Sequence, residues 1–132
     1  MIRVLLVHDS CLMRSALAER LGREPDLEVH HTPWRTAGVR VGAVAPQICV
    51  ADLDCDASYG TPPLAELRSA LVVLASKSKP GPLRRAMEAQ ALGYVDRDGP
   101  VEQLLTGIRQ AAQGQRFVDD SLGFGFLKAA QN

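Results

Sequence analysis

Short apolar runs, separated by segments with helical spacing, are the feature that most constrains the fold of this chain. Five such runs occur, at 4–7, 27–29, 48–51, 71–74 and 93–95, and most of them are apolar without interruption. Strands of this kind are covered on both faces of their sheet. A chain that alternates strands and helices forms a parallel sheet whose right-handed crossovers place helices on both faces. The sequence therefore predicts an α/β protein with five parallel strands.

The segments between the runs differ in how strongly they predict a helix. Apolar spacing predicts helices over about 11–23 and 82–91, and a third that begins at Pro100. The segment 35–44 contains two glycines, which weaken a helix, and the segment 63–69 is short. We expect these two connections to be short or irregular.

Composition narrows the class of protein. The chain has 132 residues, which suits one domain, and its 15 Lys and Arg balance its 15 Asp and Glu. Zero net charge argues against a chain whose main task is to coat nucleic acid. Its apolar runs fall short of the roughly 18 residues that span a bilayer, so we expect no membrane partner. Three cysteines without metal-ligand spacing predict free thiols, and hence a cytoplasmic protein.

Polar residues stand where the predicted strands end. His8 and Asp9 follow the first strand, and Asp52 ends the third. Asp54 and Asp56 lie just beyond Asp52, Ala75-Ser76 ends the fourth strand, and Asp96-Arg97-Asp98 ends the fifth. Because ligands of open α/β sheets bind beyond the carboxyl ends of the strands, we expect these residues to form an acidic pocket with one fixed cation.

At this point the sequence resembles the receiver domains of response regulators in two-component signalling. The resemblance covers nearly the whole chain, and it is greatest to receivers of LuxR/NarL-type transcription regulators. The segments that carry it are IRVLLVHDSCLMRSALAERLGREPDLEV, APQICVADLD and LVVLASKSKPGPLRRAMEAQALGYVDRDGPVEQLLTGIRQAAQGQRFVDDSL. The resemblance implies a flavodoxin-like (βα)5 receiver fold, with a five-stranded parallel sheet of order 2-1-3-4-5 and helices on both faces.

The resemblance also assigns roles to three residues. In these receivers two acids after the first strand and an acceptor Asp after the third hold Mg²⁺ through oxygen atoms. The metal and a Lys neutralise the phosphoryl oxygens during transfer, and a Thr or Ser with a strand-five aromatic forms the two-state switch. Asp52 matches the phosphoacceptor, Asp9 one metal acid, and Tyr94 the switch aromatic.

Three positions depart from the family pattern. His8 stands where the second acid belongs, Ala75 where the Thr belongs, and Arg97 where the Lys belongs. A neutral imidazole is a poor ligand for Mg²⁺, and the alanine offers no hydroxyl. We therefore expect an atypical receiver without a cofactor. If Mg²⁺ binding survives, Asp9 and Asp52 would hold the ion.

Arg97 suggests how such a pocket is kept neutral. A guanidinium is larger than an ammonium, planar and forked. It can form a bidentate pair with Asp52 or with Asp9, and either pair would neutralise the pocket permanently.

The leading functional hypothesis is a pseudo-receiver that is not an enzyme, needs no sensor kinase and acts as a homodimer. One candidate dimer surface combines the fourth helix, the fifth strand and the fifth helix; the first and fifth helices are the rival surface. The residues proposed for the first surface are Arg84, Arg85, Glu88, Asp96, Asp98 and Arg109.

Two alternatives stay open. A small molecule could fill the degenerate pocket around His8, Asp9, Asp52, Ala75 and Arg97. A working phosphoacceptor at Asp52 is disfavoured by the three departures taken together.

Two further features have ordinary interpretations. We expect Trp34 to pack over the irregular second helix. A soft-metal site from His8, Asp9, Cys11 and Cys55 lacks diagnostic spacing, so we interpret His8 as a structural histidine.

The end of the chain predicts a domain boundary. We expect residues 1–118 to form the receiver and residues 119–132 to start a linker helix. The apolar segment 121–127 would otherwise expose two Phe and two Leu. In the resemblance this linker leads to a C-terminal helix-turn-helix domain, so we expect DNA contact only through that absent domain.

Overall fold

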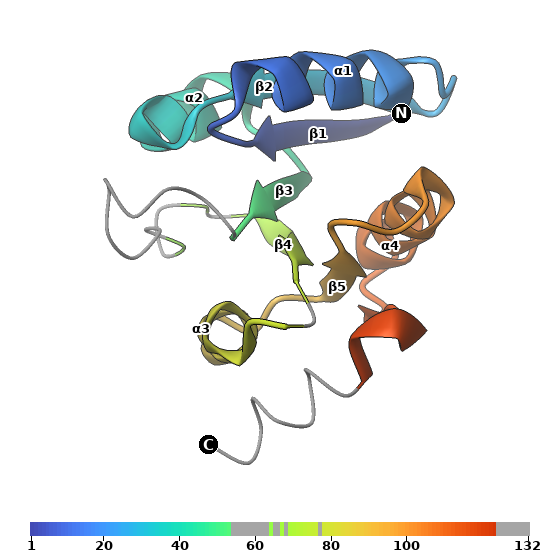
Figure 1. Cartoon of the computed structure of the whole chain (residues 1–132). Helices are drawn as coiled ribbons and strands as arrows, with labels where there is room; N and C mark the ends of the chain where they lie inside the picture. The colour runs from blue at the N-terminus through green and yellow to red at the C-terminus, as the bar shows by residue number, and fades with distance from the viewer. Residues whose placement is uncertain (54–63, 65–66, 68, 77, 124–132) are drawn as a thin grey trace.

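A parallel sheet runs through the centre of the protein (Figure 1). The computed structural model describes residues 1–53, 64, 67, 69–76 and 78–123. The sheet has six strands in the order β2-β1-β3-β4-β5-β6, and every neighbouring pair is parallel. The strands are β1 (Ile2–Val7), β2 (Leu27–Thr32), β3 (Ile48–Asp52), β4 (Ala70–Ala75), β5 (Gly93–Asp96) and β6 (Phe117–Val118).

The predicted order of the first five strands is confirmed, and one strand was missed. β6 has only two residues, with Phe117 opposite Gly93 and Val118 opposite Tyr94. A run this short carries no periodicity, so the sequence could not predict it. It forms because the chain returns beside β5 after the last helix.

The predicted helices are present with small shifts at their ends. The helical elements are α1 (Cys11–Gly22), η1 (Trp34–Thr36), α2 (Ala37–Val44), α3 (Pro80–Glu88), α4 (Val101–Ala112) and η4 (Asp120–Leu122). The predicted irregularity of 35–44 is confirmed, because a 3₁₀ turn precedes a helix of only eight residues. The predicted helix at 63–69 falls largely outside the described residues. In the part of the chain that the structure describes, no helix is long and apolar enough to cross a membrane.

The helices form one layer on each face of the sheet (Figure 1). Leu5 and Val7 of β1 pack toward α2 and α3, whereas Val4 and Leu6 pack toward α1 and α4. Successive side chains of a strand point to opposite faces, so a strand with both faces covered must be apolar throughout. This explains the uninterrupted apolar runs of the sequence.

The segment after α4 packs back onto the sheet. Phe117 contacts the α1/α4 side of the core, and Leu122 is fully buried on the α2/α3 side. Asp119 donates its backbone N–H to the Tyr94 carbonyl at 2.8 Å. Residues 124–132, on which most of the predicted linker falls, lie outside the described residues, and the boundary at 118 stays a prediction.

Candidate functional site

Asp52 is the centre of the cluster at the carboxyl edge of the sheet. It is the last residue of β3 and is 2% exposed. Arg97 donates to both carboxylate oxygens, from Nε to Oδ1 at 3.3 Å and from Nη2 to Oδ2 at 3.3 Å. The predicted bidentate pair is therefore confirmed, and the partner of Arg97 is Asp52 rather than Asp9.

The continuation of β5 places Arg97 beside Asp52. The backbone N–H of Arg97 donates to the Ala75 carbonyl at 3.0 Å, which extends the β4–β5 ladder by one residue. Val95 packs toward α1 and α4, so Arg97, two residues later, lies on the same side. The Ala75 side chain is buried in the core on the other side, toward α2 and α3. Ala75 thus brings no polar group to the cluster.

His8 closes the cluster from β1. Its Nε2 lies 3.1 Å from Asp52 Oδ2, and its Nδ1 accepts a hydrogen bond from the backbone N–H of Ser10 at 3.1 Å. A ring nitrogen that accepts carries no hydrogen, so the ring is neutral with its hydrogen on Nε2. Burial lowers the pKa of His8, Asp52 opposes this effect, and the Arg97 guanidinium adds to it. His8 thus contacts Asp52, the residue that matches the phosphoacceptor of the family, directly.

Trp34 links the two acids of the cluster. Its indole N–H donates to the backbone carbonyl of Asp52 at 3.0 Å, and its backbone N–H donates to Asp9 Oδ1 at 2.9 Å. Sequence reasoning treated Trp34 as packing and missed this role. The only signal was its place just beyond a strand end, and that position does not reveal a partner 18 residues away.

The cluster does not fit Mg²⁺. Mg²⁺ prefers octahedral oxygen ligands, and it is bound through carboxylates and water. Both Asp52 oxygens face Arg97, and His8 has no lone pair to offer, because one ring nitrogen accepts from Ser10 and the other carries hydrogen. Asp9 Oδ2 is the single buried carboxylate oxygen without a hydrogen-bond partner among the described residues. One such oxygen is too few, and the described residues contain no group of three or more potential metal ligands. Cys55, proposed for a soft-metal site, lies outside them.

The aromatic residue of β5 points into the core. Tyr94 is 1% exposed, and its hydroxyl donates to the Ala86 carbonyl at 3.5 Å. The Arg116 guanidinium lies 5.5 Å from the centre of the ring. Burial raises the pKa of the Tyr94 hydroxyl, although Arg116 opposes the shift. The residue that matches the switch aromatic therefore occupies an inward position.

The residues predicted for the dimer surface lie on three elements. Arg84, Arg85 and Glu88 lie on α3, and Asp96 and Asp98 lie at the end of β5 and just beyond it. This surface stays a prediction.

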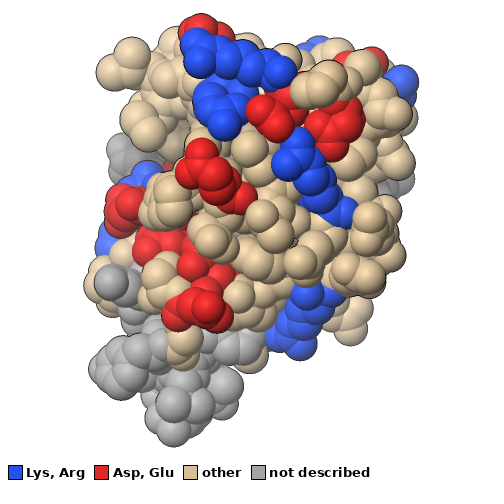
Figure 2. Space-filling model, turned by 90° about the vertical axis from the view of Figure 1, so that its right-hand side faces the viewer, with Lys and Arg blue, Asp and Glu red and all other residues tan. Residues whose placement is uncertain are grey.

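Arg109 is the remaining residue predicted for that surface. It lies on α4, in the other helical layer, and donates from Nε to Asp26 at 2.9 Å and from Nη2 to Glu24 at 2.7 Å. Basic and acidic side chains are intermingled over the face that carries α4 (Figure 2). The side chain of Arg109 is therefore paired within the chain.

A pocket of about 180 Å³ opens next to the cluster, between α1 and α4. His8 and Arg97 line it, but Asp9, Asp52 and Ala75 do not. Its other walls are mainly apolar. The cavity thus only partly coincides with the pocket predicted from the strand ends.

Comparison with known proteins identifies the family. Over 99% of its length the chain is 38% identical to the response regulator RamR of Streptomyces coelicolor, and it covers 67% of that protein. This chain belongs to the response regulators. The receiver is also 29% identical to the transcriptional regulatory protein DesR of Bacillus subtilis, of which it covers 64%. These proteins are therefore longer than the receiver. No protein-family model matches it.

Solved structures show that the fold is that of receiver domains. A two-component response regulator of the LuxR family from Aurantimonas superposes with a TM-score of 0.82 at 19% identity, covering 100% of this receiver and 99% of that chain. The signal receiver domain of the putative response regulator NarL from Mycobacterium tuberculosis superposes with a TM-score of 0.72 at 17% identity, covering 86% and 98%. The predicted resemblance to LuxR/NarL-type receivers is confirmed.

Proposed function

We propose that this receiver works without Mg²⁺-dependent phosphorylation of Asp52 and controls a transcription regulator through homodimerisation. The observation that carries the proposal is the pairing of both Asp52 oxygens with Arg97, at 3.3 Å each. His8 adds a third contact at 3.1 Å. The proposal places the receiver in the cytoplasm and gives it no enzymatic activity of its own.

The pairing opposes phosphoryl transfer for a chemical reason. A carboxylate that attacks phosphorus must present a lone pair, and charge-assisted hydrogen bonds from a guanidinium occupy the lone pairs that point toward it. Transfer also needs cationic groups around the phosphoryl oxygens, and here the cation is already paired with the acceptor. The same pair neutralises the buried charge in the absence of a phosphoryl group. Tyr94 is buried in this state, which suits a switch held in one position.

Relatives of this receiver support a proposal for the rest of the regulator. Relatives such as DesR are transcriptional regulatory proteins, and the receiver covers 64% of DesR. We propose that residues 119–132 begin a linker to a helix-turn-helix domain outside this chain, and that DNA is bound through that domain alone. Because no phosphoryl group is needed, the proposal also requires no sensor kinase.

Titration with beryllofluoride and Mg²⁺, followed by backbone amide NMR, tests the proposal. Beryllofluoride mimics an aspartyl phosphate and needs no kinase. We expect no saturable shifts at Asp52 or Tyr94 when the mimic reaches millimolar concentration. The spectrum of Asp52→Asn should likewise be the same with and without the mimic. Saturable shifts that vanish in Asp52→Asn would overturn the proposal and make Asp52 a working phosphoacceptor.

Sedimentation velocity over a range of concentrations tests the dimer. We expect a dimer that forms without any phosphoryl mimic. Arg84→Glu reverses a charge on the surface that contains α3, and Leu12→Glu changes a residue of α1 that is 79% exposed. The variant that weakens the dimer identifies the surface, and a monomer at all concentrations would remove dimerisation from the proposal.

A further inference from the structure

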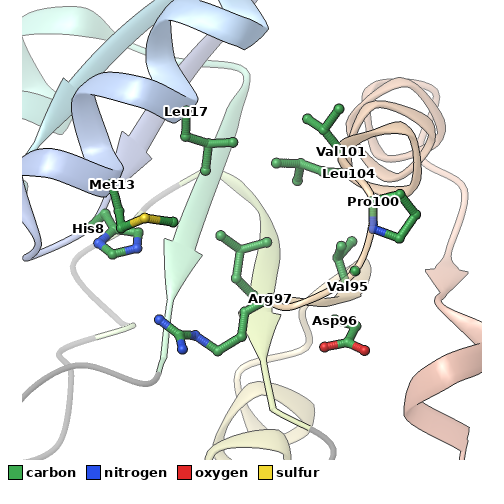
Figure 3. A pocket seen from close by; sticks show the side chains of 11 residues that line it. His8, Met13, Leu17, Val95, Asp96, Arg97, Pro100, Val101 and Leu104 are labelled. Atoms are coloured by element: carbon green, nitrogen blue, oxygen red, sulfur yellow. The ribbon is translucent and has the colours of Figure 1, made fainter.

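The pocket between α1 and α4 has an apolar body. Figure 3 shows Leu17 of α1 facing Val101 and Leu104 of α4 across the cavity. Leu74 of β4 and Val95 of β5 complete this wall from the sheet. The cavity of about 180 Å³ is comparable with an apolar protein cavity of about 150 Å³ that holds benzene. It therefore has room for one ring and a small substituent.

One end of the same pocket is polar. The Arg97 guanidinium extends toward the His8 ring at this end (Figure 3). Asp96 also lines the pocket, but its Oδ1 accepts from the Asp98 backbone N–H and its Oδ2 from the Ser121 hydroxyl. The polar end thus carries the Arg97 guanidinium and the His8 ring, whose one N–H faces Asp52. The nearby Asp96 carboxylate is satisfied by the chain itself.

We propose that this pocket binds a small uncharged molecule with an apolar body and one acceptor oxygen, such as a carbonyl. The apolar walls favour the body, and an acceptor oxygen suits the guanidinium of Arg97. An anion would be repelled by Asp96 and would have to displace Asp52 from Arg97. A cation would be repelled by Arg97. An uncharged ligand is therefore the class that suits this pocket.

The pocket is connected to the centre of the candidate site. Arg97 and His8 line the pocket and also contact Asp52, so an occupant touches both residues that hold the acceptor position. A ligand that favours one geometry of Arg97 shifts the population of the paired state. This inference rests on the proposed function, in which the Arg97–Asp52 pair stands in place of phosphorylation, and it adds a ligand that would control that pair.

Acetophenone is a suitable probe, because it combines one ring with one carbonyl oxygen and carries no charge. We expect a saturable titration of the 132-residue chain, with shifts at the Val95 and Leu104 amides and at the Arg97 Nε–H. Leu17→Trp fills the pocket and should weaken binding at least about tenfold, which is about 1.4 kcal/mol. Leu12→Trp is the matched control, because Leu12 lies on the same helix, is 79% exposed and does not line the pocket. Val101→Phe is a second filling variant, in case Leu17→Trp does not fold.

Two further probes test the chemical class. Toluene lacks the oxygen and benzoate carries a negative charge, so both should bind at least about fivefold more weakly than acetophenone. If toluene binds as tightly as acetophenone, the ligand oxygen makes no contact that contributes to binding. If benzoate binds more tightly than acetophenone, the proposal that the ligand is uncharged is wrong. If acetophenone causes no shifts, or causes the same shifts in both filling variants, the pocket is not its binding site.

Failure of this inference is distinguishable from failure of the proposed function. If beryllofluoride leaves the spectrum unchanged and acetophenone does not bind, the phosphorylation-independent receiver stands and the ligand site falls. If beryllofluoride binds at Asp52, the proposed function falls whatever acetophenone does.

Discussion

The guanidinium of Arg97 meets the carboxylate of Asp52 side-on, with Nε 3.3 Å from Oδ1 and Nη2 3.3 Å from Oδ2. The two residues are 45 positions apart in the chain and come from the ends of β3 and β5. The side chain of Asp52 is 3% exposed and that of Arg97 is 27% exposed, so water screens the pair only in part. A buried carboxylate is costly without a partner, and Arg97 is the partner that the fold supplies.

Arg97→Ala should destabilise the receiver by about 2 kcal/mol in urea unfolding. Removing one member of a buried pair leaves an uncompensated charge, which costs roughly 3–5 kcal/mol when burial is complete. The partial exposure of Arg97 reduces that cost. Arg97→Lys keeps the charge but loses the fork, so we expect an intermediate loss of about 1 kcal/mol.

Arg23→Ala is the control for this measurement. Arg23 pairs with Glu19 at 3.0 Å, but the two side chains are 68% and 72% exposed. Such surface pairs contribute roughly 0.2–1 kcal/mol. An Arg97→Ala protein as stable as Arg23→Ala would show that the Asp52 pair contributes no more to folding than an exposed surface pair.

Acidification below about pH 6.5 should lower the free energy of unfolding, and His8 should account for part of the loss. Burial lowers the pKa of His8 in the folded state, so the unfolded chain binds more protons below its own pKa of about 6.5. The contribution of His8 to the free energy of unfolding is therefore fully present above that pH. It falls as the pH drops toward the folded pKa, by up to about 1.4 kcal/mol per pH unit. Urea unfolding at several pH values between about 7 and 5 measures the slope.

A second histidine must be separated from His8. Burial lowers the pKa of His31, and the guanidinium groups of Arg14 and Arg40 lower it further, so its effect has the same sign. His8→Gln and His31→Gln should each remove a share of the pH dependence. If His8→Gln keeps the full slope of the unmodified protein, His8 is not held neutral in the fold.

Restoring the family pattern should create a phosphoacceptor. The triple variant His8→Asp, Ala75→Thr and Arg97→Lys supplies the second acid, the hydroxyl and the compact cation. We expect Mg²⁺-dependent labelling by acetyl phosphate in this variant and none in the unmodified receiver, as read by intact-protein mass spectrometry. Asp52→Asn in the same background should abolish the labelling. Labelling of the unmodified receiver at the same rate would contradict the proposed function.

Gly93→Ala should destabilise the sheet, whereas Gly42→Ala should not. A Cβ on Gly93 would lie 2.9 Å from Val72 Cγ2 in the packed core, so the neighbouring strand would have to move. Overpacking of this kind costs roughly 1–3 kcal/mol. A Cβ on Gly42 of α2 meets nothing within 4 Å, and removing a helical glycine gains roughly 0.5–1 kcal/mol. Equal melting temperatures of the two variants would contradict the close approach of β4 and β5.

The fold could be predicted from the sequence because its signals are local and repeated. Uninterrupted apolar runs such as 4–7 and 71–74 occur only where both faces of a strand are covered, and the structure covers both. Helical spacing placed both ends of α1 and the start of α4 within one residue. β6 escaped prediction because a two-residue strand has no period, and it exists only through its pairing with β5.

The sequence by itself placed His8, Asp9, Asp52 and Arg97 at one edge of a parallel sheet, because parallel strands end on the same side. It left Asp52 and Asp9 as possible partners of Arg97, and only the tertiary structure shows that the partner is Asp52. The same holds for Trp34, whose two hydrogen bonds join Asp9 to the Asp52 backbone. Such choices depend on distances of about 3 Å between side chains on separate elements. Spacing along the chain fixes which element carries a residue, whereas packing between elements fixes which atoms meet.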